Sequence, residues 1–277
     1  MQAGRGTLRL TKHEGAGNDF LVLVDPEGAP SLTEASARAL CDRHRGVGAD
    51  GVIEVGAGRD GADLSMTLRN ADGRTAEMSG NGIRCLAQAA VHAGLVAPPR
   101  FTVATAAGLR TVDYVLGARP DLASASVDMG EVTVGTDEAD PPVGSRATLV
   151  DVGNPHLVVL VADPGAVDVA AVGPKVEADH PGGINVEFMG AGAAPGELVL
   201  RVWERGVGET LACGTGACAA ASAARHWGMV GDVVHVQGPG GPLEVRLGRK
   251  DGDPVVLAGP VRKVADVTVD VAFLAGE

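Results

Sequence analysis

The sequence predicts an α/β fold of the mixed-sheet α+β type. We expect two pseudo-symmetric lobes, each with a strongly curved mixed sheet around a central helix and with the active site in the cleft between them. The first observation is that the 277-residue chain repeats itself at an offset of about 134 residues, the separation of Gly82 and Gly216. The second is the many short runs that are Val/Leu-rich or alternate in polarity, which are typical of strands: "LRLTKH", "FLVLV", "LSMTLRN", "FTVAT" and "RTVDYV".

The repeat is supported by three matches that occur in the same order. "GNDFLVLV" corresponds to "GNPHLVVLV", and "ATAAGLRTVDY" corresponds to the "GPGGPLEVRL" region. Between them, "LSMTLRNADGRTAEMSGNG" corresponds to "LVLRVWERGVGETLACGTG". We therefore expect an N-terminal lobe over 1–130 and a C-terminal lobe over 131–277, whose last strand is able to cross into the first lobe. The acidic, Pro- and Gly-rich stretch 135–145 has the composition of a connection.

Few helices are expected in each lobe. Residues 31–44 predict one, with Ser31 and Glu34 in the spacing of a capping box. Residues 79–94 predict a second, with apolar residues at helical spacing and Gly94 as its stop. Its counterpart over 213–228 is apolar on almost every side, so strands should surround it.

The composition excludes several classes of function. The net charge of −12 and the lack of Lys/Arg runs argue against nucleic-acid binding, and the 3% aromatic content offers no surface for stacking bases. "MQAGRGTLRL" contains no secretory h-region, and the apolar run 157–162 is too short to cross a bilayer. We expect a cytoplasmic protein without a membrane partner, whose four cysteines are thiols and do not form a zinc site.

Two glycine-rich turns carry the chemistry. "SGNG" and "CGTG" each follow a predicted strand and open a predicted helix, where free N–H groups and the helix dipole favour a bound carboxylate or phosphate. A thiol at such an N-cap should have a lowered pKa, so we expect Cys213 to be a reactive base or nucleophile. Ser79 at the matched position is equally consistent with a plain helix cap. Side chains from two such turns, one on each face of a substrate carbon, would suit racemisation or epimerisation.

Eight motifs resemble diaminopimelate epimerases along essentially the whole chain. In order they are "GAGNDF", "GVGADG", "NADG", "SGNGIRC", "GNPH", "GINVEF", "ERGVGET" and "ACGTGAC". The resemblance implies a cofactor-independent isomerase with two similar α/β lobes, which interconverts LL- and meso-diaminopimelate for lysine and peptidoglycan precursors using two cysteines as acid and base. It also implies a homodimer and no metal.

The resemblance also implies roles for individual residues. Cys213 matches one catalytic cysteine, and Ser79 stands where the family has the other. The implied substrate contacts are Asn18, Asn70, Gly80, Asn81, Asn154, Asn185, Glu204, Arg205, Gly214 and Thr215. His156 and Glu204 are implied to tune the pKa of the acid–base groups. Arg and amide side chains suit the zwitterionic distal end of diaminopimelate, because they bind carboxylate and ammonium groups.

Simpler interpretations stand beside these. The asparagines of "NADG" and "GNPH" are common turn residues, and Glu204 with Arg205 would make an ordinary surface ion pair. Cys41, Cys85 and Cys218 fit core positions, and "GVGADG" is expected to supply a turn without chemistry.

Ser79 breaks the pattern, because a hydroxyl is a far weaker acid than a thiol. Four hypotheses remain open from the sequence. The chain is an epimerase with a natural serine, or an epimerase changed at one cysteine. Alternatively it is a one-base lyase or racemase for another amino acid, or a non-enzymatic binder of an amino-dicarboxylate.

Overall fold

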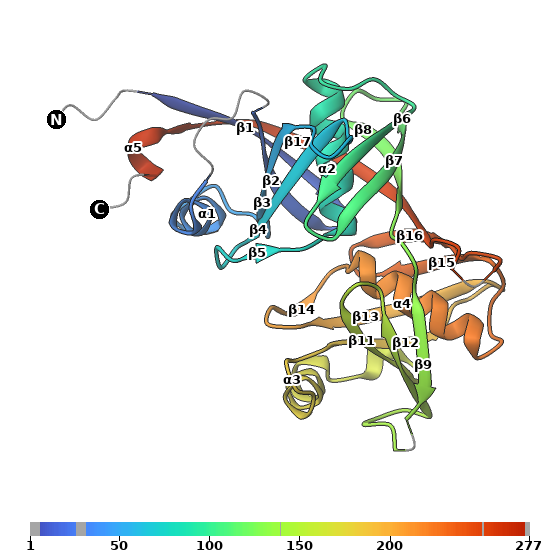
Figure 1. Ribbon diagram of the computed structural model, residues 1–277. Helices are drawn as coiled ribbons and strands as arrows, with labels where there is room; N and C mark the ends of the chain where they lie inside the picture. The colour runs from blue at the N-terminus through green and yellow to red at the C-terminus, as the bar shows by residue number, and fades with distance from the viewer. Residues whose placement is uncertain (1–5, 26–31, 139, 251, 275–277) are drawn as a thin grey trace. The chain divides into compact units, whose positions relative to one another are not determined.

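The computed structural model describes residues 6–25, 32–138, 140–250 and 252–274 (Figure 1). The chain divides into two compact units, Met1–Val127 with Pro260–Glu277, and Asp128–Gly259. The long strand β17 (Val256–Asp270) begins in the second unit and continues in the first. The stretch from Gly135, expected to connect the lobes, begins inside the strand β9 (Thr133–Asp137) of the second unit.

The first unit is a sheet that closes on itself. Its other strands are β1 (Thr7–Gly15), β2 (Asn18–Val24), β3 (Gly51–Ala57), β4 (Leu64–Asn70), β5 (Thr75–Ala76), β6 (Arg100–Thr105), β7 (Gly108–Leu116) and β8 (Leu122–Asp128). The pairings run β1–β2–β3–β4–β6–β7–β8–β17 and return to β1, with β2–β3 and β4–β6 parallel. Such a closed mixed sheet has no free edge along the ring.

The helix α2 (Gly80–His92) occupies the middle of this unit. Its residues from Gly80 to Ala90 are all buried, and it contacts β1, β2, β3, β4 and β7. Figure 1 shows it among those strands. The central helix predicted from the apolar spacing is confirmed.

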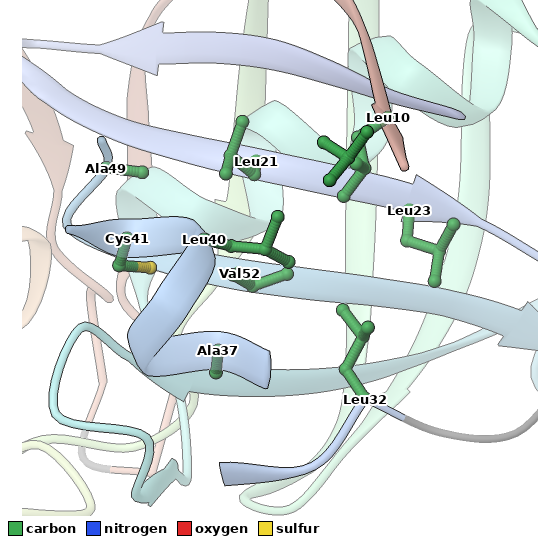
Figure 2. Close-up of a cluster of buried hydrophobic side chains, with 10 residues drawn as sticks. Leu10, Leu21, Leu23, Leu32, Ala37, Leu40, Cys41, Ala49 and Val52 are labelled. Atoms are coloured by element: carbon green, nitrogen blue, oxygen red, sulfur yellow. The ribbon is translucent and has the colours of Figure 1, made fainter. Parts of the chain in front are cut away.

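A second helix, α1 (Glu34–Cys41), packs on the other face of the strands. Leu21 and Val52 belong to its apolar cluster (Figure 2). Ile53, the next residue of β3, points to the opposite side, where its Cδ1 lies beneath Gly82 of α2. The predicted start and end of this helix were wrong. Thr33 is the N-cap and accepts from the Ser36 N–H at 3.1 Å, while Ser31 lies outside the described residues. The short helix α5 (Val271–Leu274) follows β17.

The second unit repeats the same plan. Its strands are β9 (Thr133–Asp137), β10 (Arg146–Asp151), β11 (Pro155–Leu160), β12 (Asn185–Ala191), β13 (Glu197–Glu204), β14 (Gly208–Thr210), β15 (Val233–Gly238) and β16 (Gly241–Arg246). They pair in the order β9–β10–β11–β12–β13–β15–β16, and the first residues of β17 pair with β16. The β11–β12 and β13–β15 pairs are parallel, as in the first unit.

The helix α4 (Gly214–His226) fills the centre of this unit. Every residue from Gly214 to Ala224 is buried, and strands β9 to β13, β15 and β16 contact the helix. The predicted wrapping of this apolar helix is confirmed.

The helix α3 (Val169–Asp179) packs on the other face of β11 and β12, after the 3₁₀ turn Pro164–Ala166. The expected fold class, mixed sheets around central helices, is therefore correct.

The two central helices also end alike. At α2, Gly94 has φ +73°, and the N–H groups of Gly94 and Leu95 donate to Val91 and Ala90. Gly228 also has φ +73° and ends α4 with the equivalent pair of bonds. This is the Schellman arrangement, in which glycine adopts a left-handed conformation. Gly94 thus ends its helix as predicted.

Among the described residues, no helix is long and apolar enough to span a membrane.

Candidate active site

The N-terminus of α2 is capped by Ser79. Its hydroxyl accepts a hydrogen bond from the Gly82 N–H at 3.0 Å, and its backbone is extended, with φ −142°. Gly80 and Asn81 form a buried first turn. The predicted cap is confirmed, and the side chain lies where the free N–H groups and the positive end of the helix dipole converge.

Cys213 takes the same position on α4. Its Sγ accepts from the Gly216 N–H at 3.3 Å and lies 3.3 Å from the Thr215 hydroxyl. The residue is buried, with 8% of its surface exposed. A thiol thus serves as the cap even though cysteine is not a preferred N-cap residue.

The expected lowering of the Cys213 pKa was wrong. Burial raises its pKa well above the ordinary thiol value, and the carboxylates of Glu204 and Glu187 raise it further. The hydrogen bonds from Thr215 and Gly216 act in the opposite direction but are smaller. The helix dipole alone therefore does not decide the protonation state, and Cys213 is a thiol at neutral pH.

In the first unit, the amide of Asn18 is held by neighbours. Ala16 and Gly17 both have positive φ and form the tight turn that delivers Asn18 to the start of β2. Its Nδ2 donates to Asp50 at 2.6 Å, and its Oδ1 lies 3.4 Å from Nδ2 of Asn81. Asp50 also pairs with Arg43 at 2.8 Å. The motif "GVGADG" therefore does more than turn the chain, because its aspartate fixes a predicted site residue.

A buried arginine lies beneath the α2 turn. Arg84 has no exposed surface, and its guanidinium donates to the Gly80 carbonyl at 2.9 Å and to Oδ1 of Asn81 at 2.8 Å. Its Nε also donates to the Pro260 carbonyl at 3.3 Å. Because Oδ1 of Asn81 accepts from Arg84, the amide NH₂ is directed toward Asn18. Sequence reasoning missed this residue, although "SGNGIRC" contains it.

In the second unit, Asn185 connects two segments. Its Nδ2 donates to the Pro155 carbonyl at 2.9 Å, and its Oδ1 accepts from the Arg205 N–H at 3.0 Å. The side chain of Arg205 crosses Gly183, where a Cβ would lie 3.0 Å from the arginine stem. Gly183 also has φ +74°, so both its conformation and its lack of a side chain are required there.

A chain of buried polar groups runs beside α4. Nε2 of His156 lies 2.9 Å from Oδ1 of Asn154, and its Nδ1 lies 2.8 Å from Oε1 of Glu187. The His156 and Glu187 side chains have no exposed surface. Glu187 is a further residue that sequence reasoning missed, because "GINVEF" gave no sign that its carboxylate faces a helix N-terminus.

The remaining predicted residues lie near these groups in their own units. Asn70 ends β4 and is half-buried, and Glu204 ends β13 and accepts from the Thr210 hydroxyl. Gly214 and Thr215 are buried in the first turn of α4. The first unit thus holds a serine-capped helix start with an amide cluster, and the second holds a thiol-capped helix start with an imidazole–carboxylate pair.

A sequence profile described as diaminopimelate epimerase matches residues 10–134 and 148–264. The chain belongs to the diaminopimelate epimerase family. A diaminopimelate epimerase of Synechococcus elongatus is 40% identical, over 96% of this chain and 99% of the relative. One from a Cyanothece species is 41% identical, over 93% of this chain and 98% of the relative.

Solved structures of lower identity share the fold. A hydroxyproline epimerase from Agrobacterium vitis superposes with a TM-score of 0.75 at 18% identity, covering 98% of this chain and 94% of that protein. A Bacillus anthracis protein of the phenazine biosynthesis PhzF family gives 0.74 at 16% identity, covering 95% and 99%. These likenesses place the fold of this diaminopimelate epimerase family member among amino-acid epimerases and their structural relatives.

Proposed function

We propose that this chain is an isomerase that interconverts LL- and meso-diaminopimelate in lysine biosynthesis, without a cofactor. The supporting observation is the matched pair of central helices. Each is capped by a side-chain oxygen or sulfur held against the N–H group three residues later, by Ser79 at 3.0 Å and by Cys213 at 3.3 Å. Full-length relatives that bear the name of this activity support the choice of substrate.

Cys213 carries the better acid–base group. It is a thiol at rest, so it can protonate a carbanion at the α-carbon, and its thiolate can remove the α-proton again. The family resemblance implies that Ser79 serves the opposite face of the same carbon. Its hydroxyl gives up a proton much less readily, so inversion is slower than proton exchange on the Cys213 face.

The substrate is held by two sets of groups. The N–H groups of the two helix turns bind the reacting carboxylate. Arg205 binds the distal carboxylate through its guanidinium, and Asn185 fixes the backbone from which Arg205 projects. The remaining contacts to substrate come from Asn18, Asn70, Asn154 and Glu204, with Gly80, Asn81, Gly214 and Thr215 forming the turns.

The proposal also covers the oligomeric state and the cellular location of the enzyme. We place it in the cytoplasm as a homodimer, following the family resemblance. Light scattering of the purified protein tests the dimer, since a mass near the 27.8 kDa of one chain would contradict it. Fractionation of expressing cells tests the location.

Proton exchange in D₂O tests the reaction. LL- and meso-diaminopimelate are incubated separately, and deuterium at the α-carbon and the stereochemistry of the product are followed by NMR and chiral chromatography. We expect deuterium incorporation that is faster than inversion with the isomer whose α-proton faces Cys213, and incorporation into the other isomer only as fast as the two interconvert. Cys213→Ala is the matched control and should abolish exchange.

Other results would point elsewhere. Exchange that never leads to inversion would identify a one-base enzyme, and release of a β-substituent from another amino acid would identify a lyase. Binding without exchange would identify an amino-dicarboxylate binding protein. If the folded protein neither binds nor exchanges either isomer, the proposed substrate is wrong.

A further inference from the structure

One pair of matched core positions is apolar in the first unit and polar in the second. In the first unit these positions hold Phe20 of β2 and Ile53 of β3, which are 3% and 0% exposed. The second unit has His156 of β11 and Glu187 of β12 instead, with no exposed surface on either side chain. An apolar pair in one repeat thus corresponds to a hydrogen-bonded polar pair in the other.

Strand register and helix contacts both support this correspondence. β2 pairs with β3 in the same parallel register as β11 with β12. Under α2, a Cβ at Gly82 would meet Cδ1 of Ile53 at 3.1 Å. Under α4, a Cβ at Gly216 would meet Oε1 of Glu187 at 2.7 Å. Ile53 and Glu187 therefore lie beneath the same residue of their respective helices.

The fold itself does not require the polar pair. Phe20 and Ile53 fill the matched positions with apolar side chains, and burying a carboxylate costs free energy that a hydrogen-bonded partner only partly offsets. In addition, Oε2 of Glu187 has no hydrogen-bond partner among the described residues. A group that is costly to bury and unnecessary for packing must be explained by its contacts.

Those contacts lead to a substrate-binding side chain. Glu187 Oε1 lies 2.8 Å from Nδ1 of His156, and Nε2 of the same ring lies 2.9 Å from Oδ1 of Asn154. An amide oxygen only accepts, so Nε2 must carry a proton. The contact at Nδ1 then holds one further proton, donated either by the ring or by the carboxyl group. Without Glu187, the ring would lose the contact that fixes its tautomer and its orientation.

We propose that Glu187 is a positioning residue: it orients the ring of His156, which in turn orients the amide of Asn154 for substrate. Glu187 lies beneath the turn and reaches the substrate only through two other side chains, so it is not itself the acid or base of the reaction. This inference rests on the proposed function, because it is there that Asn154 is assigned to the substrate.

Four variants test the role. Glu187→Leu removes the hydrogen bond, and Glu187→Gln retains a group that can bond Nδ1. The double variant His156→Phe/Glu187→Ile replaces the polar pair of the second unit with the apolar pair found in the first. Ile53→Leu is the matched control beneath α2. KM and kcat for diaminopimelate are measured with thermal unfolding of each folded variant.

We expect KM to change while thermal stability does not. Glu187→Leu and the double variant should raise KM about tenfold or more, while unfolding stays within about 3 °C of the unchanged protein. Glu187→Gln should keep KM within about threefold, because it preserves the contact with His156. Ile53→Leu should leave KM unchanged. A folded Glu187→Leu variant with unchanged KM would overturn the proposal, as would a Glu187→Gln variant that is as impaired as Glu187→Leu.

A double-mutant cycle shows whether the effect passes through Asn154. Glu187→Leu should add little to the KM of Asn154→Ala, since the amide that it positions is already gone. Fully additive effects would contradict the proposed route.

Nitrogen-15 NMR of the His156 ring separates this inference from the proposed function. Glu187→Leu should shift the ring-nitrogen signals relative to the unchanged protein, even if diaminopimelate is not the substrate. Unchanged ring signals would overturn the positioning role. If the unchanged protein neither binds nor exchanges diaminopimelate while the ring signals do shift, only the proposed function fails.

Discussion

At the scale of single residues, the hydroxyl of Ser79 and the thiol of Cys213 share a geometry but not an acidity. Both accept the N–H three residues later, so a thiol fits the α2 cap without rebuilding the turn. We expect Ser79→Cys to raise the rate of epimerisation by about 10² or more, because general acid–base groups contribute on that order. Inversion of LL-diaminopimelate, followed by chiral chromatography, measures it.

Ser79→Ala is the control for this substitution. It removes the cap and should cost about 1 kcal/mol of stability without raising activity. If Ser79→Cys folds normally and leaves the rate unchanged, a weak acid–base group at this position is not what limits inversion.

The burial of Cys213 makes a second prediction. Because its pKa is raised well above the ordinary thiol value, iodoacetamide should label it slowly at neutral pH, and labelling should keep accelerating above pH 9. Mass spectrometry of the peptide that contains Cys213, after timed labelling between pH 7 and 10, measures the rate. Urea-unfolded protein provides the reference, with a thiol pKa of about 8.5. Rapid labelling that levels off below pH 8 in the folded protein would contradict the prediction.

At the scale of elements, the third residue of each central helix has no room for a side chain. In α4, a Cβ at Gly216 would meet Oε1 of Glu187 at 2.7 Å, an oxygen already held by His156. In α2, a Cβ at Gly82 would meet the terminal methyl of Ile53 at 3.1 Å, which can rotate away more easily. The two helices therefore differ in how well they tolerate an added methyl group.

We expect Gly216→Ala to destabilise the protein by about 1–3 kcal/mol, and Gly82→Ala to destabilise it less. Urea unfolding of the two variants provides the comparison, and each serves as the control for the other. Equal losses would show that the carboxylate beneath α4 moves as freely as the isoleucine methyl group beneath α2.

At the scale of the whole molecule, the internal repeat made most of the fold predictable. Apolar spacing with a terminal glycine is a local signal, and it placed α2 from its cap at Ser79 to its stop at Gly94. The all-apolar counterpart likewise predicted a wrapped α4. A local signal failed at α1, where the capping-box spacing predicted Ser31 as the cap but Thr33 caps the helix.

The rest depended on contacts between residues distant in sequence. Asp50 reaches Asn18 only because β2 and β3 lie side by side, and Glu187 reaches His156 across β11 and β12. No spacing rule encodes such pairs. The Cys213 pKa was mispredicted for a related reason, because burial by surrounding strands outweighs the helix dipole that the sequence revealed.

A buried histidine in the first unit links folding to pH. His13 has no exposed surface, and its ring contacts Gln88 and Thr11 at 2.9 Å each. The pKa of His13 is lowered from 6.5 to about 4, chiefly by burial. Gln88 and Asp266 act to raise the pKa, and the nearby His92 and Lys263 act to lower it. The unfolded chain therefore binds a proton between pH 6.5 and 4 that the folded chain does not, so acid favours unfolding across that range.

We therefore expect the free energy of unfolding to fall as the pH drops from 6.5 to about 4, with His13 contributing about 3 kcal/mol of that loss. Urea unfolding at half-unit steps of pH measures the slope. His13→Asn removes the titrating ring, so it should flatten the curve above pH 4, where carboxylates with depressed pKa values remain charged. His44→Asn alters an exposed histidine and should leave the slope unchanged. An equally steep curve in His13→Asn would show that other groups cause the acid sensitivity.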